Sequence, residues 1–182
     1  MKKSYFSTFQ LILLALFSAL VVVAKIALRM PIQLSGHSGL FWMAIVIVGM
    51  RVVPKPGAGS VIGVTSGILA GFLGLGDFGV LDTFLSYALL GIVADIILWV
   101  LGGDAENVVV AILAATLGHT AKFVVKWVFG LITGAPLGFV ALGLLKAIIS
   151  YIVFGALGGF LGWLTIGALK KAGFFAYMAE KR

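Results

Sequence analysis

The sequence predicts an all-α integral membrane protein: one domain, residues 1–182, with six transmembrane helices and both termini in the cytoplasm. Of the 182 residues, 62% are hydrophobic and only 10% are charged, and the mean hydropathy is +1.23. A soluble domain of this size could not cover so much apolar surface with so few charges. The apolar residues also fall into runs of near-membrane length, which Gly, Pro and Asp separate.

A membrane-spanning helix needs about 20 apolar residues, and six runs qualify. The first follows Met1-Lys2-Lys3 as the apolar part of a signal peptide would, but no A-x-A-like cleavage site follows it, so we interpret it as a span. The second is short, and the sixth is long enough to tilt or to project into the cytoplasm. The runs cover residues 6–28, 39–53, 58–75, 83–101, 108–131 and 137–169.

The distribution of positive charge predicts the orientation. Cytoplasmic segments of membrane proteins carry an excess of Lys and Arg. With the amino terminus inside, the outer loops would hold Arg29 alone. The cytoplasmic segments would hold eight of the thirteen Lys and Arg residues, namely Lys2, Lys3, Arg51, Lys55, Lys170, Lys171, Lys181 and Arg182.

Glycine recurs at every fourth position of the third run, at Gly59, Gly63, Gly67 and Gly71. Small residues at this spacing form a continuous seam along a helix, against which another helix can pack backbone to backbone. We expect this seam to serve packing within the chain rather than between copies of it.

Several classes of function have no support in the sequence. It contains no Walker A motif, no HExxH, no GxSxG and no closely spaced pair of carboxylates. His37 and His119 have no third ligand at metal-site spacing, and the absence of cysteine excludes thiolate metal sites. The pI is near 9.9, but no basic patch with interleaved aromatics indicates nucleic acid. We therefore expect no enzyme, no metal, no cofactor and no nucleic-acid partner.

The most informative polar residues lie in the fifth run. His119, Lys122 and Lys126 follow the i, i+3, i+7 spacing that places side chains on one face of a helix. A charged amine in hydrocarbon costs roughly 2.5–3.5 kcal/mol on insertion scales, so such residues usually face the bundle interior or a wet cavity. This face is predicted to form a binding site.

The core and the outer edge of the membrane region together hold an excess of positive charge, which favours an anionic ligand. The five cations Lys25, Arg29, Lys122, Lys126 and Lys146 stand against the three carboxylates of Asp77, Asp82 and Asp95. Alternatives remain open: Lys25, Arg29 and Lys126 could extend to the headgroups instead. Asp95 could pair with Lys122 or with Lys146, which would halve the excess positive charge that is available to a ligand.

Residues 29–38, which read RMPIQLSGHS, form an unusually polar outer loop. It is longer than the 4–6 residues of most connections. Such a loop could close over a ligand as a lid, or it could be an ordinary connection. Trp42, Phe123, Trp127 and Phe129 could add ring faces to a cavity, although the two tryptophans could equally be interfacial anchors.

Over essentially its whole length, the chain resembles the S components of energy-coupling-factor (ECF) vitamin transporters. The resemblance rests on Ala15-x-x-x-Ala19, on the run PKPGAGSVIGVTSGILAGFLG at 54–74, and on AKFVVKWVFGLITGAP at 121–136. A final span ending in LKKAG completes it. The 54–74 run looks most like S components for thiamine precursors such as hydroxymethylpyrimidine.

The resemblance implies that the chain captures a vitamin or vitamin precursor in an outward-facing pocket, in the plasma membrane of a prokaryote. Ala15 and Ala19 would face a transmembrane coupling subunit, and two ATPase subunits would supply the energy. The pocket would include His37, Asp82, Tyr87, His119, Lys122, Phe123, Lys126 and Lys146.

The charges of the pocket leave the ligand open. Thiamine-type ligands are cationic and suit a carboxylate and aromatic cage, whereas these residues are rich in lysine and fit an anionic vitamin or a carboxylated precursor better. A different mechanism is also open: a self-contained proton-coupled transporter or channel, acting as an oligomer, with Asp95, His119 and Lys122 as a proton relay.

Overall fold

The computed structural model describes residues 5–28, 34–134 and 137–180, which form seven helices and no strand. Four segments are long and apolar enough to cross a membrane: α1, α4, α5 and the Gly143–Lys171 part of α6. The helices α2 and α3 are apolar but shorter, at 14 and 15 residues. The helices are α1 (Thr8–Ala27), α2 (Gly39–Val52), α3 (Ala58–Phe72), α4 (Val80–Val100), α5 (Val108–Ile132), α6 (Leu137–Lys171) and α7 (Phe174–Glu180).

The six apolar runs of the sequence therefore each become a helix, with the second short and the sixth long as expected. Polar side chains define where two of them begin. Ser7 accepts from the backbone N–H of Gln10, whose side chain accepts from the N–H of Ser7 in return, which forms a capping box for α1. Asn107 accepts from the N–H groups of Val109 and Val110 at the start of α5.

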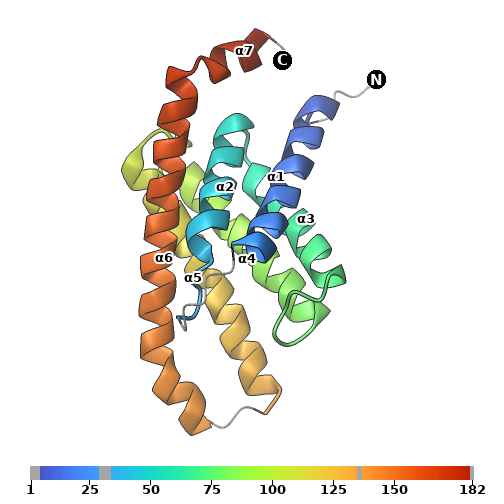
Figure 1. Ribbon diagram of the computed structural model, residues 1–182, viewed down its shortest axis with the longest axis vertical. Coiled ribbons are helices and arrows are strands. Elements are labelled where there is room, and N and C mark those ends of the chain that lie inside the picture. The colour runs from blue at the N-terminus through green and yellow to red at the C-terminus, as the bar shows by residue number, and fades with distance from the viewer. Residues whose placement is uncertain (1–4, 29–33, 135–136, 181–182) are drawn as a thin grey trace.

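Neighbouring helices close a ring in the order α1, α3, α4, α5, α6, α2. Consecutive helices run in alternating directions, so that α1 begins, and α6 ends, at the same end of the bundle (Figure 1). The helix α2 also contacts α3 and α5, and ten of its fourteen residues are buried. It is therefore a member of the ring that its neighbours largely bury.

The glycine seam packs within the chain, as predicted. A Cβ on Gly63 would lie 2.5 Å from the carbonyl oxygen of Tyr87 and 2.9 Å from the Cα of Gly91, so the backbones of α3 and α4 are in direct contact. A Cβ on Gly67 would lie 2.8 Å from the carbonyl oxygen of Phe84. This contact fixes the position of α4 against α3.

Asp95 has a different partner from either of those that the charge pattern suggested. Its side chain on α4 accepts hydrogen bonds from the backbone N–H groups of Gly59, at 3.1 Å, and Ser60, at 2.5 Å. These belong to the first turn of α3, whose own residues offer no side-chain cap, and a carboxylate is favourable at the positive end of a helix. Asp95 is therefore a cap supplied by a neighbouring helix, and no ion pair joins it to Lys122 or Lys146 among the described residues.

Candidate functional site

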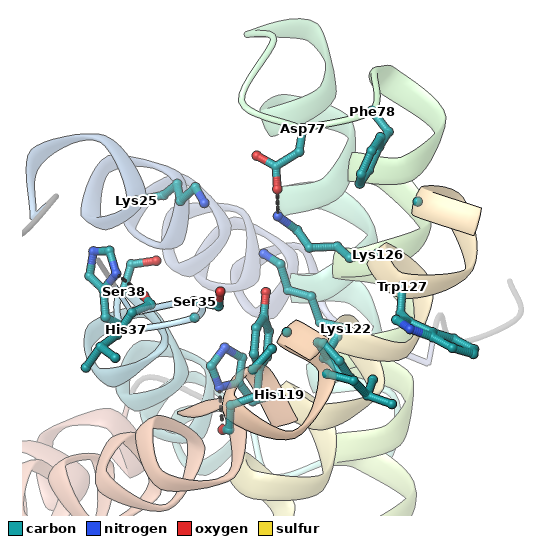
Figure 2. Close-up of a pocket in the computed structure, with 18 of the residues that line it drawn as sticks. Lys25, Ser35, His37, Ser38, Asp77, Phe78, His119, Lys122, Lys126 and Trp127 are labelled. Carbon is teal, nitrogen blue, oxygen red and sulfur yellow. Dashed lines mark hydrogen bonds and ion pairs between the residues drawn. The ribbon is translucent and has the colours of Figure 1, made fainter. Parts of the chain in front are cut away.

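A cavity of about 830 Å³ lies at the end of the bundle where α1 ends and α2 begins (Figure 2). The described part of the predicted lid, the α3–α4 connection, α5 and α6 all contribute to its wall. The polar and aromatic side chains that line it are Lys25, Ser35, His37, Ser38, Trp42, Asp77, Phe78, His119, Lys122, Phe123, Lys126, Trp127 and Tyr151.

The shortness of α2 leaves room for this cavity. Fourteen residues at 1.5 Å each extend about 21 Å, against about 30 Å for the hydrocarbon core of a bilayer. Residues 34–38 line the cavity directly before α2, and a Cβ on Gly36 would lie 3.1 Å from the His119 ring on α5. A Cβ on Gly39 would lie 2.2 Å from the His119 ring, so only glycine leaves space for that ring at the base of the cavity.

Lys122 is the buried cation of the site. Its side chain is 3% exposed, and its ammonium group makes no hydrogen bond within the described residues. Nζ lies 3.5 Å from the centre of the Tyr87 ring and 4.5 Å from that of Trp42. Such contacts are worth roughly 0.5–2 kcal/mol, whereas the desolvation of an ammonium costs several kcal/mol. The two rings therefore offset only part of the cost, and an anionic group beside Nζ would offset more.

His119 is fully buried at the base of the cavity. Its Nδ1 lies 2.9 Å from the carbonyl oxygen of Tyr151, and its ring packs at 4.9 Å from Trp42 and 4.5 Å from Tyr151, measured between ring centres. The Nε2 atom has no hydrogen-bond partner within the described residues. The rings around it hold its plane in place.

Lys126, the third member of the predicted face, has a protein partner. Its ammonium group forms an ion pair with Asp77 in the α3–α4 connection (Figure 2). Partial burial acts to raise the pKa of Asp77, but the charge and the hydrogen bond of Lys126 outweigh it, and the pKa lies below its ordinary value of 3.8. Asp77 therefore stays ionised at neutral pH and neutralises the charge of Lys126.

The described part of the predicted lid is fixed to the helices beneath it. Ser150 on α6 donates a hydrogen bond to the carbonyl oxygen of Ser35 at 2.6 Å, and Trp42 donates to the hydroxyl of Ser38 at 3.3 Å. The Nδ1 of His37 lies 2.7 Å from the carbonyl oxygen of Leu34. Residues 29–33, including Arg29, Pro31 and Gln33 of the same prediction, lie outside the described residues.

The eight residues predicted for the pocket occupy three kinds of position. Two are buried close to the wall: the Tyr87 ring lies under Lys122, and Asp82 accepts a hydrogen bond from Ser86 at 3.3 Å. Lys146 is exposed and does not line the cavity. The five that line it are His37, His119, Lys122, Phe123 and Lys126.

The exclusion of Lys146 follows from the periodicity of α6. The residues of α6 that line the cavity are Gly143, Leu144, Ala147 and Tyr151, which form one helical face. Lys146 precedes Ala147 by one residue, which is about 100° around the helix. The resemblance placed Lys146 in the pocket, but its side chain lies on a face of α6 outside the cavity wall.

Tyr151 is the main lining residue that the prediction omitted. It supplies the carbonyl group that holds His119, and its ring packs against His119 and Phe123. A signal was present, since Ser150 and Tyr151 form a polar pair within an apolar run, and both contact the site. Phe129, in contrast, was proposed as a ring face and does not line the cavity.

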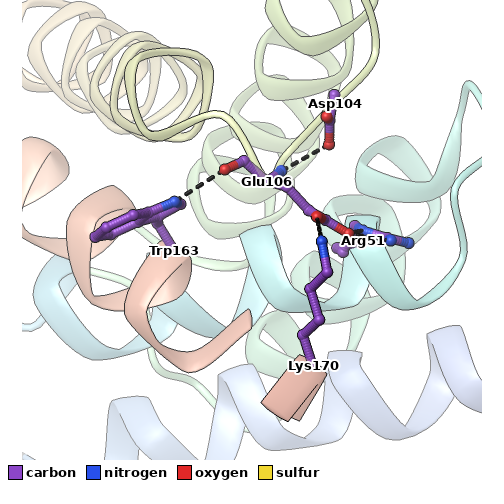
Figure 3. Close-up of polar contacts among 5 residues, drawn as sticks. All are labelled: Arg51, Asp104, Glu106, Trp163 and Lys170. Atoms are coloured by element: carbon purple, nitrogen blue, oxygen red, sulfur yellow. Dashed lines mark hydrogen bonds and ion pairs between the residues drawn. The ribbon is translucent and has the colours of Figure 1, made fainter. Parts of the chain in front are cut away.

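A second polar cluster lies around Glu106 in the α4–α5 connection (Figure 3), at the end of the bundle where α2 and α6 end (Figure 1). Its carboxylate forms ion pairs with Arg51 of α2 and Lys170 of α6, and Trp163 donates to its backbone carbonyl at 2.9 Å. The Arg51 guanidinium also lies 4.5 Å from the centre of the Phe175 ring on α7. These side chains pair with one another, so the cluster joins α2, α6 and the α4–α5 connection.

Glu106→Gln is expected to lower the melting temperature at pH 7 by about 2–4 °C, which corresponds to about 1 kcal/mol. Hydrogen bonds from Lys170 and Arg51 hold the pKa of Glu106 below its ordinary value of 4.5. The stabilisation is therefore complete above pH 4.5 and is lost as the pH falls through the lower folded value. The difference between wild type and variant should disappear in acid. Thermal unfolding in detergent across pH 3–7 measures it.

Lys171→Met is the matched control, because Lys171 is exposed and makes no ion pair among the described residues. It should leave the melting temperature unchanged. If the difference in melting temperature between the wild type and Glu106→Gln were the same at every pH, the ion-pair explanation would be contradicted.

Comparisons with known proteins identify no relative. No family model matches the chain, and neither curated proteins nor solved structures give a significant match. The interpretation of the cavity therefore depends on its own geometry and charges.

Proposed function

We propose that this chain captures a small organic anion from outside the cell, as the substrate-binding S component of an ECF-type importer. The observation that carries the proposal is the ammonium group of Lys122, which is buried in the wall of an 830 Å³ cavity with no hydrogen-bond partner among the described residues. Ligand pockets are typically largely apolar cavities of about 300–1,000 Å³ with a few placed polar groups. A carboxylate or phosphate on the ligand would supply the missing counter-charge.

The proposed orientation has six spans, both termini in the cytoplasm and the cavity open to the outside. The basic residues Arg51 and Lys170 lie in the last turns of α2 and α6, at the end of the bundle opposite the cavity (Figure 1), as the positive-inside rule requires of the cytoplasmic end. In this arrangement α2 and α3 count as spans despite their length. Protein surrounds α2 on nearly all sides, so it need not match the bilayer by itself.

The proposal includes a membrane-embedded coupling subunit and two ATPase subunits as partners, in the plasma membrane of a prokaryote. Ala15 and Ala19 lie on an exposed face of α1, and small residues there would allow a partner helix to approach closely. The alternative proton relay loses support, because Asp95 caps α3 and is buried beside Gly59 and Ser60 instead of adjoining His119.

Native mass spectrometry of gently purified protein tests the capture of a ligand. We expect one bound small molecule per chain that carries a carboxylate or phosphate, and a cationic or absent molecule would contradict the proposed anion. Uptake by reconstituted vesicles tests the mechanism. Transport by this chain alone, driven by a proton gradient and indifferent to ATP, would overturn the S-component assignment, whereas co-purification with a coupling subunit and two ATPases would support it.

A further inference from the structure

The hydrogen bond of His119 determines which of its nitrogen atoms is left as a hydrogen-bond acceptor. Nδ1 lies 2.9 Å from the carbonyl oxygen of Tyr151. A carbonyl oxygen can only accept, so Nδ1 must carry the proton of this hydrogen bond. A neutral imidazole carries one N–H, which leaves Nε2 as a bare acceptor. The tautomer is thus assigned from the bond that the ring makes.

The acceptor is buried and cannot turn away to find another donor. His119 is 0% exposed, and its Nε2 has no hydrogen-bond partner among the described residues. Trp42 and Tyr151 pack against the ring, and a Cβ on Gly39 would be only 2.6 Å from Nε2. Leaving a buried acceptor unpaired carries the full desolvation penalty of that group, so a donor on the ligand would bring a gain in affinity that an apolar atom could not.

Lys122 therefore requires a hydrogen-bond acceptor on the ligand, whereas His119 requires a donor on the same ligand. An ammonium group is a donor only, whereas the bare Nε2 is an acceptor only. Both side chains line the same cavity, and they lie three residues apart on one face of α5 (Figure 2). The rings of Trp42, Phe123 and Tyr151 lie around them and provide flat apolar surface.

We infer that the ligand is a planar ring compound that carries both an anionic group for Lys122 and an N–H or O–H donor for Nε2 of His119. This rests on the proposed function and narrows its substrate class. Aromatic acids without a donor, and ring cations, are excluded as good ligands. His119 then acts as the residue that selects for the donor.

The tautomer can be measured directly, because the chain contains only two histidines. We would record ¹⁵N chemical shifts of histidine-labelled protein in detergent and assign the signals with His37→Asn. The expected pattern for His119 is a protonated, pyrrole-type Nδ1 and a bare, pyridine-type Nε2. A proton on Nε2, with or without one on Nδ1, would overturn the inference.

Ligand preference is tested with two size-matched pairs of probes, 3- and 4-hydroxybenzoate against 3- and 4-methylbenzoate. The hydroxyl and the methyl group are similar in size, but only the hydroxyl donates. By isothermal titration calorimetry, at least one hydroxybenzoate should bind tenfold more tightly than its methyl counterpart. In His119→Phe the preference should vanish or reverse, since the acceptor is gone while a ring remains.

The same probes can be followed on the wild-type protein, which avoids any dependence on the folding of His119→Phe. Only a hydroxybenzoate should move the Nε2 signal toward the protonated type. Equal affinity within both pairs, a preference that survives in His119→Phe, or no binding of any probe would overturn the inference.

These outcomes are separate from a failure of the proposed function. Benzoate binding that is lost in Lys122→Met, without any advantage from a hydroxyl, would leave anion capture intact and remove only the donor requirement. Purified protein without a bound anion, together with benzoate binding that is unaffected in Lys122→Met, would remove the proposed function itself.

Discussion

Lys122→Met is expected to weaken binding of the anionic ligand at least tenfold, about 1.4 kcal/mol, while the protein still inserts and folds. Methionine keeps an unbranched apolar side chain between the Tyr87 and Trp42 rings, so the wall of the cavity is largely preserved. Of the described lysines that line the cavity, Lys122 is the one whose buried charge has neither an ion-pair nor a hydrogen-bond partner, and this substitution removes that charge. Calorimetry with the ligand identified by mass spectrometry measures the change.

Lys146→Met is the matched control, because it removes an equal charge from a neighbouring helix at an exposed position outside the cavity wall. It should leave affinity within about twofold of wild type. Equal affinities for the wild type, Lys122→Met and Lys146→Met would show that Lys122 has a structural role only. Lys126→Met should fall between the two, since Asp77 already neutralises that lysine.

Gly63→Ala is expected to cause the largest loss of stability, about 1–3 kcal/mol, the usual cost of overpacking. The new Cβ would lie 2.5 Å from the carbonyl oxygen of Tyr87 and 2.9 Å from the Cα of Gly91. Both neighbours are backbone atoms, so α3 and α4 must separate along their whole contact. The rotation of a flexible side chain cannot relieve the clash. Thermal unfolding in detergent should show the loss as a lower melting temperature.

Gly167→Ala provides the comparison, because a Cβ at that position on α6 meets no atom within 4 Å. Alanine has the higher helix propensity, by about 1 kcal/mol in water, so this variant should be neutral or slightly more stable. If Gly63→Ala and Gly167→Ala had the same melting temperature, the backbone contact between α3 and α4 would be refuted.

The helices were predictable because each depends on a local property of the chain. Apolar runs and the Gly, Pro and Asp residues between them placed six of the helices. The second helix was expected to be short, because its apolar run covers only residues 39–53 and ends before Pro54. The helix α7 was not predicted. Its seven residues are too few to span a membrane, and it forms where Phe175 packs under Arg51, which is distant in sequence.

The binding face of α5 was predictable for the same reason. His119, Lys122 and Lys126 are close in sequence, and helical periodicity alone puts them on one side. Periodicity gave no information about which residues of other helices lie opposite this face of α5. Lys146 was assigned to the pocket through the family resemblance, although the face of α6 that it occupies lies outside the cavity wall.

By itself, the sequence determined that this chain is helical and belongs in a membrane, and it determined which side of α5 carries the polar residues. Only the tertiary structure decided the partner of each charge. It assigned Asp95 to the start of α3, Asp77 to Lys126, and no hydrogen bond within the described residues to Lys122. Hydropathy and periodicity act over a few turns of one helix, whereas pairing depends on how distant helices pack, as the contact between Gly63 and Gly91 illustrates.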